Sequence, residues 1–108
     1  KIFSYKKQKI EEKKYTKWFD YDKIKNSPCV RTRRQGDYLT VNSEGGRKKL
    51  NRIFIDEKIP AEMRDRLPVV AAGSEILWIP GGRMNEKYKI TSTTGRVLEL
   101  HYQGGALA

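Results

Sequence analysis

The spacing of hydrophobic residues predicts short strands at the start of the chain. Residues 16–24 alternate between apolar and polar side chains well enough for a strand, and the Asn-Ser-Pro sequence at 26–28 ends it. We expect a second strand over 29–34, a turn over 35–37 and a third strand over 38–41. This first stretch is therefore expected to be mainly β-structure.

The clearest helix is predicted from Arg47 to about Asp56. Leu50, Ile53 and Phe54 recur at spacings of three and four residues, which places them on one buried stripe of a helix. The first turns of this predicted helix are strongly basic, although cations oppose the helix dipole at that end. We infer that these charges serve another purpose, and phosphate binding is the natural one.

The rest of the pattern predicts a second short helix and two hairpins. The expected positions are 61–66 for the helix, 69–72 with 75–79 for the first hairpin, and 88–91 with 97–102 for the second. These elements predict an α+β fold, in which two short helices are inserted between two small sets of strands.

A chain of 108 residues suits one domain, because a second core would have too little chain around it. The lysine-rich segment 1–14 is expected to be a linker or a leading helix from an upstream domain, followed by the domain at 15–102 and a loose tail at 103–108. The absence of an initiator Met suggests a fragment of a longer protein.

The formal net charge is +10, and all of the excess lies in the first half of the chain. Residues 1–54 hold 16 Lys and Arg against 6 Asp and Glu, whereas residues 55–108 hold 7 of each kind. Such asymmetry favours a polyanion-binding face, and nucleic acid in particular, over a merely solvated basic surface. A membrane surface is less favoured, because no amphipathic basic helix is evident.

The residue counts exclude several kinds of site. One cysteine, Cys29, cannot form an intramolecular disulfide and suggests an intracellular protein, and one Cys with one His, His101, cannot make the usual zinc site. No phosphate-binding glycine loop and no nucleophile motif is present, and no apolar run approaches the roughly 18 residues that span a membrane. We expect no catalysis, cofactor or metal in this chain itself.

The strongest candidate phosphate contacts are Lys48, Lys49 and Arg52, at the start of the predicted helix. Arg31, Arg33 and Arg34 form a second cluster with two open interpretations. Their guanidinium groups suit bidentate binding of phosphate, but cations on an edge strand also prevent aggregation.

Other notable residues are expected to have structural roles. We predict core packing rather than base stacking for Trp18 and Trp78, and a small buried hydrophobe at Cys29. A metal set is one interpretation of three acidic residues, namely Asp20, Asp22 and Asp56. They lack the spacing of a calcium-binding loop, and we expect them to be caps or ion-pair partners.

An ordered series of motifs, from about residue 15 to residue 102, resembles the C-terminal domain of tRNA(Ile)-lysidine synthase. The series is Phe19-Asp20-x-Asp22-Lys23-Ile24, Arg31-x-Arg33-x-x-Gly36-Asp37, Lys48-Lys49-Leu50-x-x-x-Phe54-Ile55-Asp56-x-Lys58-Ile59-Pro60, Arg64-Asp65-x-x-Pro68-Val69-Val70 and Trp78-Ile79-Pro80-Gly81-x-Arg83. The stretch from Lys48 to Pro60 is the most specific. Two departures are Gln35, where the family often has Pro, and Tyr38, where a basic residue is common.

The resemblance implies a small layered β-sandwich-like α+β fold, similar to a domain of the phenylalanyl-tRNA synthetase β-subunit. Full-length members are cytoplasmic ATP-dependent ligases, expected to use magnesium, that attach lysine to the wobble cytidine of the isoleucine tRNA with a CAU anticodon. Their adenylating site lies in an N-terminal domain whose Ser-Gly-Gly-x-Asp-Ser loop is absent here. This chain is therefore expected to carry no chemistry.

The resemblance implies that such a C-terminal domain grips the tRNA acceptor stem, which suits basic side chains because A-form RNA is recognised through its shape and phosphates. The expected contacts are Lys48, Lys49, Arg52, Arg31 and Arg33, followed by Arg34, Arg64 and Arg83. The main alternative is a packing or dimerisation module without direct RNA contact, built on residues 69–102 and giving a homodimer of the parent. A hydrolytic editing domain is a more distant alternative.

Overall fold

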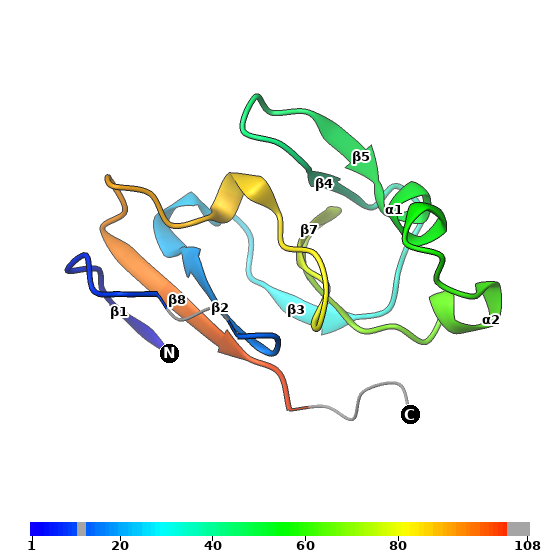
Figure 1. The fold of residues 1–108 in the computed structure, drawn as a ribbon, viewed down its shortest axis with the longest axis horizontal. Coiled ribbons are helices and arrows are strands. Elements are labelled where there is room, and N and C mark those ends of the chain that lie inside the picture. Colours follow the sequence, from blue (N-terminus) through cyan, green and yellow to red (C-terminus); the bar gives the residue numbers. More distant parts are fainter. Residues whose placement is uncertain (11–12, 104–108) are drawn as a thin grey trace.

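Two β-sheets and two short α-helices make up the fold in the computed structural model, which describes residues 1–10 and 13–103 (Figure 1). The strands are β1 (Ile2–Ser4), β2 (Thr16–Asp20), β3 (Cys29–Arg31), β4 (Tyr38–Thr40), β5 (Arg47–Lys49), β6 (Val69–Ala72), β7 (Glu75–Trp78) and β8 (Arg96–His101). The helices are α1 (Leu50–Asp56) and α2 (Ala61–Arg64), and single 3₁₀ turns lie at η1 (Tyr21–Lys23) and η2 (Glu86–Tyr88). The predicted α+β class with two short helices is confirmed.

The smaller sheet joins the beginning of the chain to its end. Its strand order is β1-β8-β2, with both pairings antiparallel. Phe3 lies opposite Val97 on one side of β8, and Phe19 lies opposite Leu98 on the other. The segment expected to be a linker or leading helix thus supplies a strand, and β1 belongs to the folded domain.

The larger sheet has the order β3-β6-β7-β4-β5. The predicted hairpin of β6 and β7 is confirmed, and it turns at Gly73, whose φ of +67° suits glycine. β4 joins the sheet through a parallel bridge between Tyr38 and Glu75, and β5 forms the outer edge.

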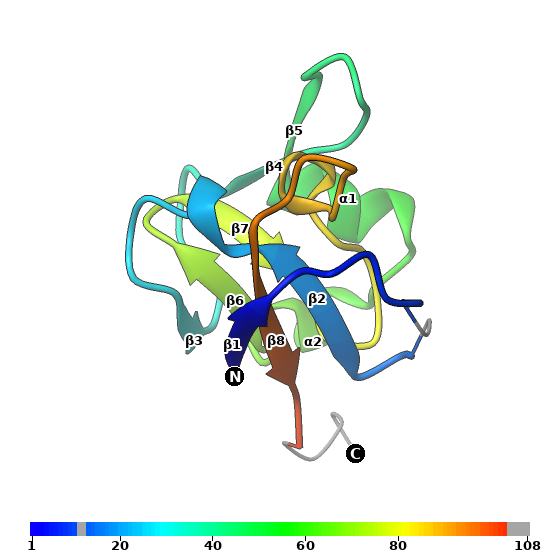
Figure 2. The same cartoon turned by 90° about the vertical axis from the view of Figure 1, so that its left-hand side faces the viewer.

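Both faces of the larger sheet are buried at its central strands β6 and β7, which makes the molecule layered. Alternate residues of β6 point to opposite faces, so that Val69 packs with α1 residues and Val70 packs toward the smaller sheet. The first core cluster contains Leu39, Leu50, Ile53, Phe54, Leu67, Val69, Ala71, Ile76 and Ile79, and the second contains Phe19, Val70, Ala72, Leu77, Trp78, Tyr88 and Leu98. Figure 2 shows β1, β8 and β2 in front of β6 and β7.

The element predicted as one helix over 47–56 consists of strand β5 followed by helix α1. Lys49 lies opposite Tyr38 in the sheet, and the Leu50 backbone N–H donates to the carbonyl of Asp37 at 2.9 Å. The side-chain spacing at 50–54 did indicate the helix, but the three residues before it satisfy their backbone groups by pairing with β4. The basic residues at 47–49 therefore lie on a strand rather than on a helix.

Other boundaries also differ from the prediction. The strand expected over 29–34 ends at Arg31, whose side chain turns toward Asp37, and Cys29 on it is exposed rather than buried. The strand expected at 88–91 is absent from the described residues: its first residue, Tyr88, belongs to η2, and β8 pairs with β1 and β2 instead. Apart from Gln103, the tail predicted at 103–108 lies outside the described residues.

A buried hydroxyl supports the packing of η2 against the larger sheet. The Tyr88 side chain is 2% exposed, and its hydroxyl donates to Glu75 on β7. Burial raises the pKa of Tyr88 well above its usual value. The hydroxyl therefore stays protonated and remains a donor to the carboxylate.

Replacing Tyr88 with Phe removes this donor and leaves the Glu75 carboxylate less well paired. We expect the free energy of unfolding to fall by about 1–2 kcal/mol in urea denaturation. Tyr21→Phe is the matched control, because no hydrogen bond to the Tyr21 hydroxyl occurs in the described structure, and it should change stability by less than about 0.5 kcal/mol. Equal effects of the two substitutions would contradict this role.

Candidate nucleic-acid interface

The predicted arginine cluster begins with a buried ion pair. The Arg31 guanidinium donates to both carboxylate oxygens of Asp37 at 2.8 and 2.9 Å, and also to the carbonyls of Thr32 and Gly73. The Arg31 side chain is 10% exposed and that of Asp37 is 2% exposed. The same carboxylate accepts the Arg34 backbone N–H at 2.7 Å. Arg31 therefore fixes the turn at 32–37 and presents little charge to solvent.

Arg33 connects that turn to both helices. Its Nε donates to Asp65 at 2.7 Å and its Nη1 donates to Asn51 on α1 at 2.9 Å. In the strand predicted over 29–34, Arg31 and Arg33 would share one face, but the strand ends at Arg31 and each arginine has separate partners. Arg33 remains partly accessible, with a quarter of its side chain exposed.

Lys48 and Arg52 meet at one carboxylate. Lys48 on β5 pairs with Asp56 at the end of α1, and Arg52 lies 3.1 Å from the same side chain. The hydrogen bond from Lys48 and the charge of Arg52 hold the pKa of Asp56 below its usual value. This trio keeps one net positive charge at the surface, and Asp56 has the ion-pairing role that was predicted.

Lys49 and Arg34 are the cations best placed to meet a phosphate. Both side chains are exposed, and neither has an ion pair or side-chain hydrogen bond in the described structure. Their backbones adjoin Asp37, because its carbonyl accepts the Leu50 N–H and its N–H donates to the Arg34 carbonyl. The backbone of Asp37 thus holds together the segments that carry the two exposed cations.

Arg47 joins them, although it was not among the predicted contacts. Its guanidinium lies 4.7 Å from the centre of the Tyr38 ring, across the strand pair from β5 to β4. Alternation along β5 places Arg47 and Lys49 on the face opposite Lys48. No local signal could have revealed this face, because residues 47–49 are all basic and the helical spacing follows them directly. We call Arg34, Arg47 and Lys49 the β5-edge surface.

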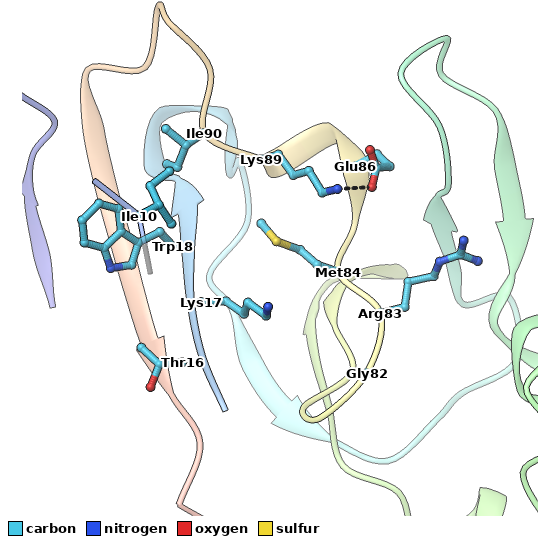
Figure 3. Close-up of a pocket in the computed structure, with 10 residues that line it drawn as sticks. All are labelled: Ile10, Thr16, Lys17, Trp18, Gly82, Arg83, Met84, Glu86, Lys89 and Ile90. Carbon is cyan, nitrogen blue, oxygen red and sulfur yellow. Dashed lines mark ion pairs between the residues drawn. The ribbon is translucent and has the colours of Figure 1, made fainter. Parts of the chain in front are cut away.

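The remaining two candidates lie on other elements, namely α2 and the loop after β7. Arg64 on α2 folds back, and its Nε donates to the Ile59 carbonyl at 2.9 Å. Arg83 is exposed in the loop after β7, and its side chain points away from Trp18 in Figure 3. The structure therefore brings the β5-edge surface together with Lys48, Arg52 and Arg33 around α1.

Two features that would indicate other functions are absent from the described residues. No group of three or more His, Cys, Asp or Glu side chains that could hold a metal ion occurs among residues 1–10 and 13–103. No helix in that part of the chain is long and apolar enough to cross a membrane.

Comparison with known proteins gives consistent matches. Residues 29–100 match the family described as the TilS substrate C-terminal domain. The tRNA(Ile)-lysidine synthase of Caldanaerobacter subterraneus subsp. tengcongensis is 50% identical over 88 residues, covering 82% of this chain and 19% of that protein. The synthase of Clostridium tetani is 41% identical over 90 residues, with 83% and 19% covered.

A solved structure agrees with the sequence matches. The crystal structure of a TilS C-terminal domain superposes with a TM-score of 0.71 at 33% identity, covering 94% of this chain and 82% of that one. The chain spans about a fifth of the length of the curated relatives it matches.

Proposed function

Because the chain belongs to the TilS substrate C-terminal domain family, we propose that it is the tRNA-binding domain of a tRNA(Ile)-lysidine synthase. The parent protein is an ATP-dependent cytoplasmic ligase that joins lysine to the wobble cytidine of the isoleucine tRNA with a CAU anticodon, using magnesium. The chemistry belongs to another domain of the parent, and this domain holds the tRNA at its acceptor stem.

The β5-edge surface carries this proposal. Lys49 and Arg34 are exposed cations without ion-pair partners in the described structure, and Arg47 is held beside them against Tyr38. Exposed cations on a rigid strand and turn suit the phosphates of an A-form stem, which proteins recognise by shape and backbone charge. Lys48 and Arg52 extend the positive surface, while Arg31 and Arg33 position it through their ion pairs with Asp37 and Asp65.

The test is a salt titration of the binding of this domain to the isoleucine tRNA. Contacts with three to five phosphates should make the association constant fall by roughly three decades or more per decade of salt concentration. Elongator methionine tRNA serves as competitor, and a preference for the isoleucine tRNA supports recognition of the acceptor stem. Steep salt dependence without preference supports general RNA binding instead, and affinity that does not change with salt contradicts the proposal.

One observation favours the alternative function, in which the domain packs against a second copy of itself. An apolar groove of about 190 Å³ lies between the edge strand β3 and β8, and it is lined by Pro28, Cys29, Val30, Val70, Trp78, Leu98, Leu100, His101 and Tyr102. Val30 beside it is 60% exposed. Sedimentation of the domain separates the two functions, because a dimer that binds no RNA supports packing and a monomer that binds RNA does not.

A further inference from the structure

Trp18 was expected in the core, but it lies on the outer face of the smaller sheet. Strand alternation directs its neighbour Phe19 into the core between the sheets and Trp18 to the opposite side. The indole N–H donates to Glu99 at 2.8 Å, and the Phe3 ring meets the indole edge-to-face with centres 4.9 Å apart. The ring is therefore fixed in orientation while part of it remains accessible. Trp78, by contrast, is 1% exposed, as predicted.

Three surface hollows meet at this indole. Their volumes are about 350, 430 and 580 Å³, and Trp18 lines all three. The first lies between β2 and the segment 82–90, and Figure 3 shows Ile10 and Ile90 beside the indole and Met84 on the opposite wall. Lys17 extends from β2 toward Met84. The ring therefore has open space around it rather than a packed neighbour on every side.

The same hollows are lined by lysines. Six of them border one hollow or another, namely Lys1, Lys6, Lys9, Lys13, Lys17 and Lys89. The acidic residues among the described lining are Glu86, which pairs with Lys89, and Glu99, which accepts the indole N–H. We call Trp18 with these six lysines the Trp18 surface.

We propose that the Trp18 surface binds unpaired RNA nucleotides, with a base stacked on the indole and the flanking phosphates beside the lysines. A fixed, partly exposed aromatic ring among cations is the arrangement that single-stranded nucleic acid requires, because the faces of unpaired bases are free to stack. In a duplex those faces are covered, so a stem can use the lysines but not the indole. The lysine-rich lining also disfavours an apolar peptide as the occupant.

This proposal rests on the proposed RNA binding by the domain, and it adds that unpaired nucleotides are the part of the RNA recognised at Trp18. In Figure 1, β2, which carries Trp18, lies at the left with β8, and β5 lies at the upper right. A stem on the β5-edge surface and its unpaired end on the Trp18 surface would therefore contact the domain separately. Each contact can be removed without the other.

The experiment compares two RNA hairpins binding to this domain. One hairpin ends bluntly, and the other carries an unpaired extension of about eight nucleotides, a usual site size for single-strand binding. We expect the extension to raise affinity about tenfold, since stacking of one base contributes that much or more. We also expect the extension to protect Trp18 from acrylamide quenching, and an extension with abasic positions to lose most of the gain.

Variants test whether the gain in affinity from the extension comes from the Trp18 surface. Trp18→Leu should bind the blunt hairpin like the unaltered chain and lose the advantage of the extension. Because Trp18→Leu also removes the indole contacts with Phe3 and Glu99, Lys6→Gln with Lys9→Gln provides a second test on exposed residues, and it should reduce the advantage severalfold. Lys25→Gln is the control, an exposed lysine outside the three hollows.

The outcomes separate this proposal from the proposed function. An extension that gives no advantage, or the same advantage in Trp18→Leu, overturns the Trp18 surface while leaving stem binding intact. Failure of the blunt hairpin to bind contradicts the β5-edge surface instead. If the blunt hairpin does not bind, the proposal is tested with the single-stranded extension alone. A base stacked on the indole should quench the fluorescence of Trp18, and an unchanged fluorescence would refute the stacking contact.

Discussion

Replacing Asp37 with alanine is expected to lower the free energy of unfolding by about 3–5 kcal/mol. This loss is a large part of the net stability of a small domain. The substitution leaves the Arg31 guanidinium buried without its carboxylate and removes the acceptor of the Arg34 backbone N–H. A buried charge without a partner is among the most destabilising single changes. Urea denaturation followed by circular dichroism measures the loss.

An exposed pair in the same region provides the matched control. Asp65 also accepts a hydrogen bond from an arginine, Arg33, but its side chain is 78% exposed, so Asp65→Ala should cost less than about 1 kcal/mol. A second check is Arg31→Met combined with Asp37→Ala, which should be less destabilising than the sum of the two single changes. Similar losses for Asp37→Ala and Asp65→Ala would show that the pair between Arg31 and Asp37 has no special structural role.

Reversing the charges of the β5-edge surface, with Arg34→Glu and Lys49→Glu together, is expected to weaken RNA binding at about 0.1 M salt by a factor of about 100 or more. Both side chains are exposed and have no ion pairs in the described structure, so the fold should be unchanged. The slope of the logarithm of the association constant against the logarithm of the salt concentration should also become shallower, by the amount that corresponds to about two lost phosphate contacts. Filter binding with the isoleucine tRNA over a range of salt concentrations measures both quantities.

The control for this experiment must match the change in charge but lie elsewhere. Lys25→Glu with Lys58→Glu adds the same negative charge at exposed lysines outside the β5-edge surface, and it should weaken binding by less than about fivefold. Lys48 is not chosen, because a glutamate there would face Asp56 and disturb α1. Equal weakening by both double variants would mean that total charge, rather than this surface, determines binding.

The local patterns of the sequence predicted several elements correctly. The spacing of Leu50, Ile53 and Phe54 indicated α1, because a three- and four-residue period places side chains on one face of a helix whatever packs against it. The hairpin of β6 and β7 was likewise indicated by two apolar runs around Gly73. The motif series also indicated the family, which the comparisons confirm.

Long-range pairing could not be predicted in the same way. β1 pairs with β8 across almost the whole chain, and a three-residue strand such as Ile2–Ser4 has too few residues to show a period. The pairing of β5 with β4 similarly overrode the helical pattern that begins after it. These strands exist because a partner strand satisfies their backbone groups, and that partner is distant or obscured in the sequence.

The sequence by itself therefore determined the fold class, the family and the excess of positive charge in the first half of the chain. Only the tertiary structure decided how each cation is used: Arg31 in a buried ion pair, Lys49 exposed without an ion pair in the described structure. The exposure of Trp18 was also decided by the tertiary structure, because an apolar strand pattern does not show which face of the sheet will be covered. Composition and local spacing are properties of the chain alone, whereas burial and pairing depend on the side chains that folding brings together.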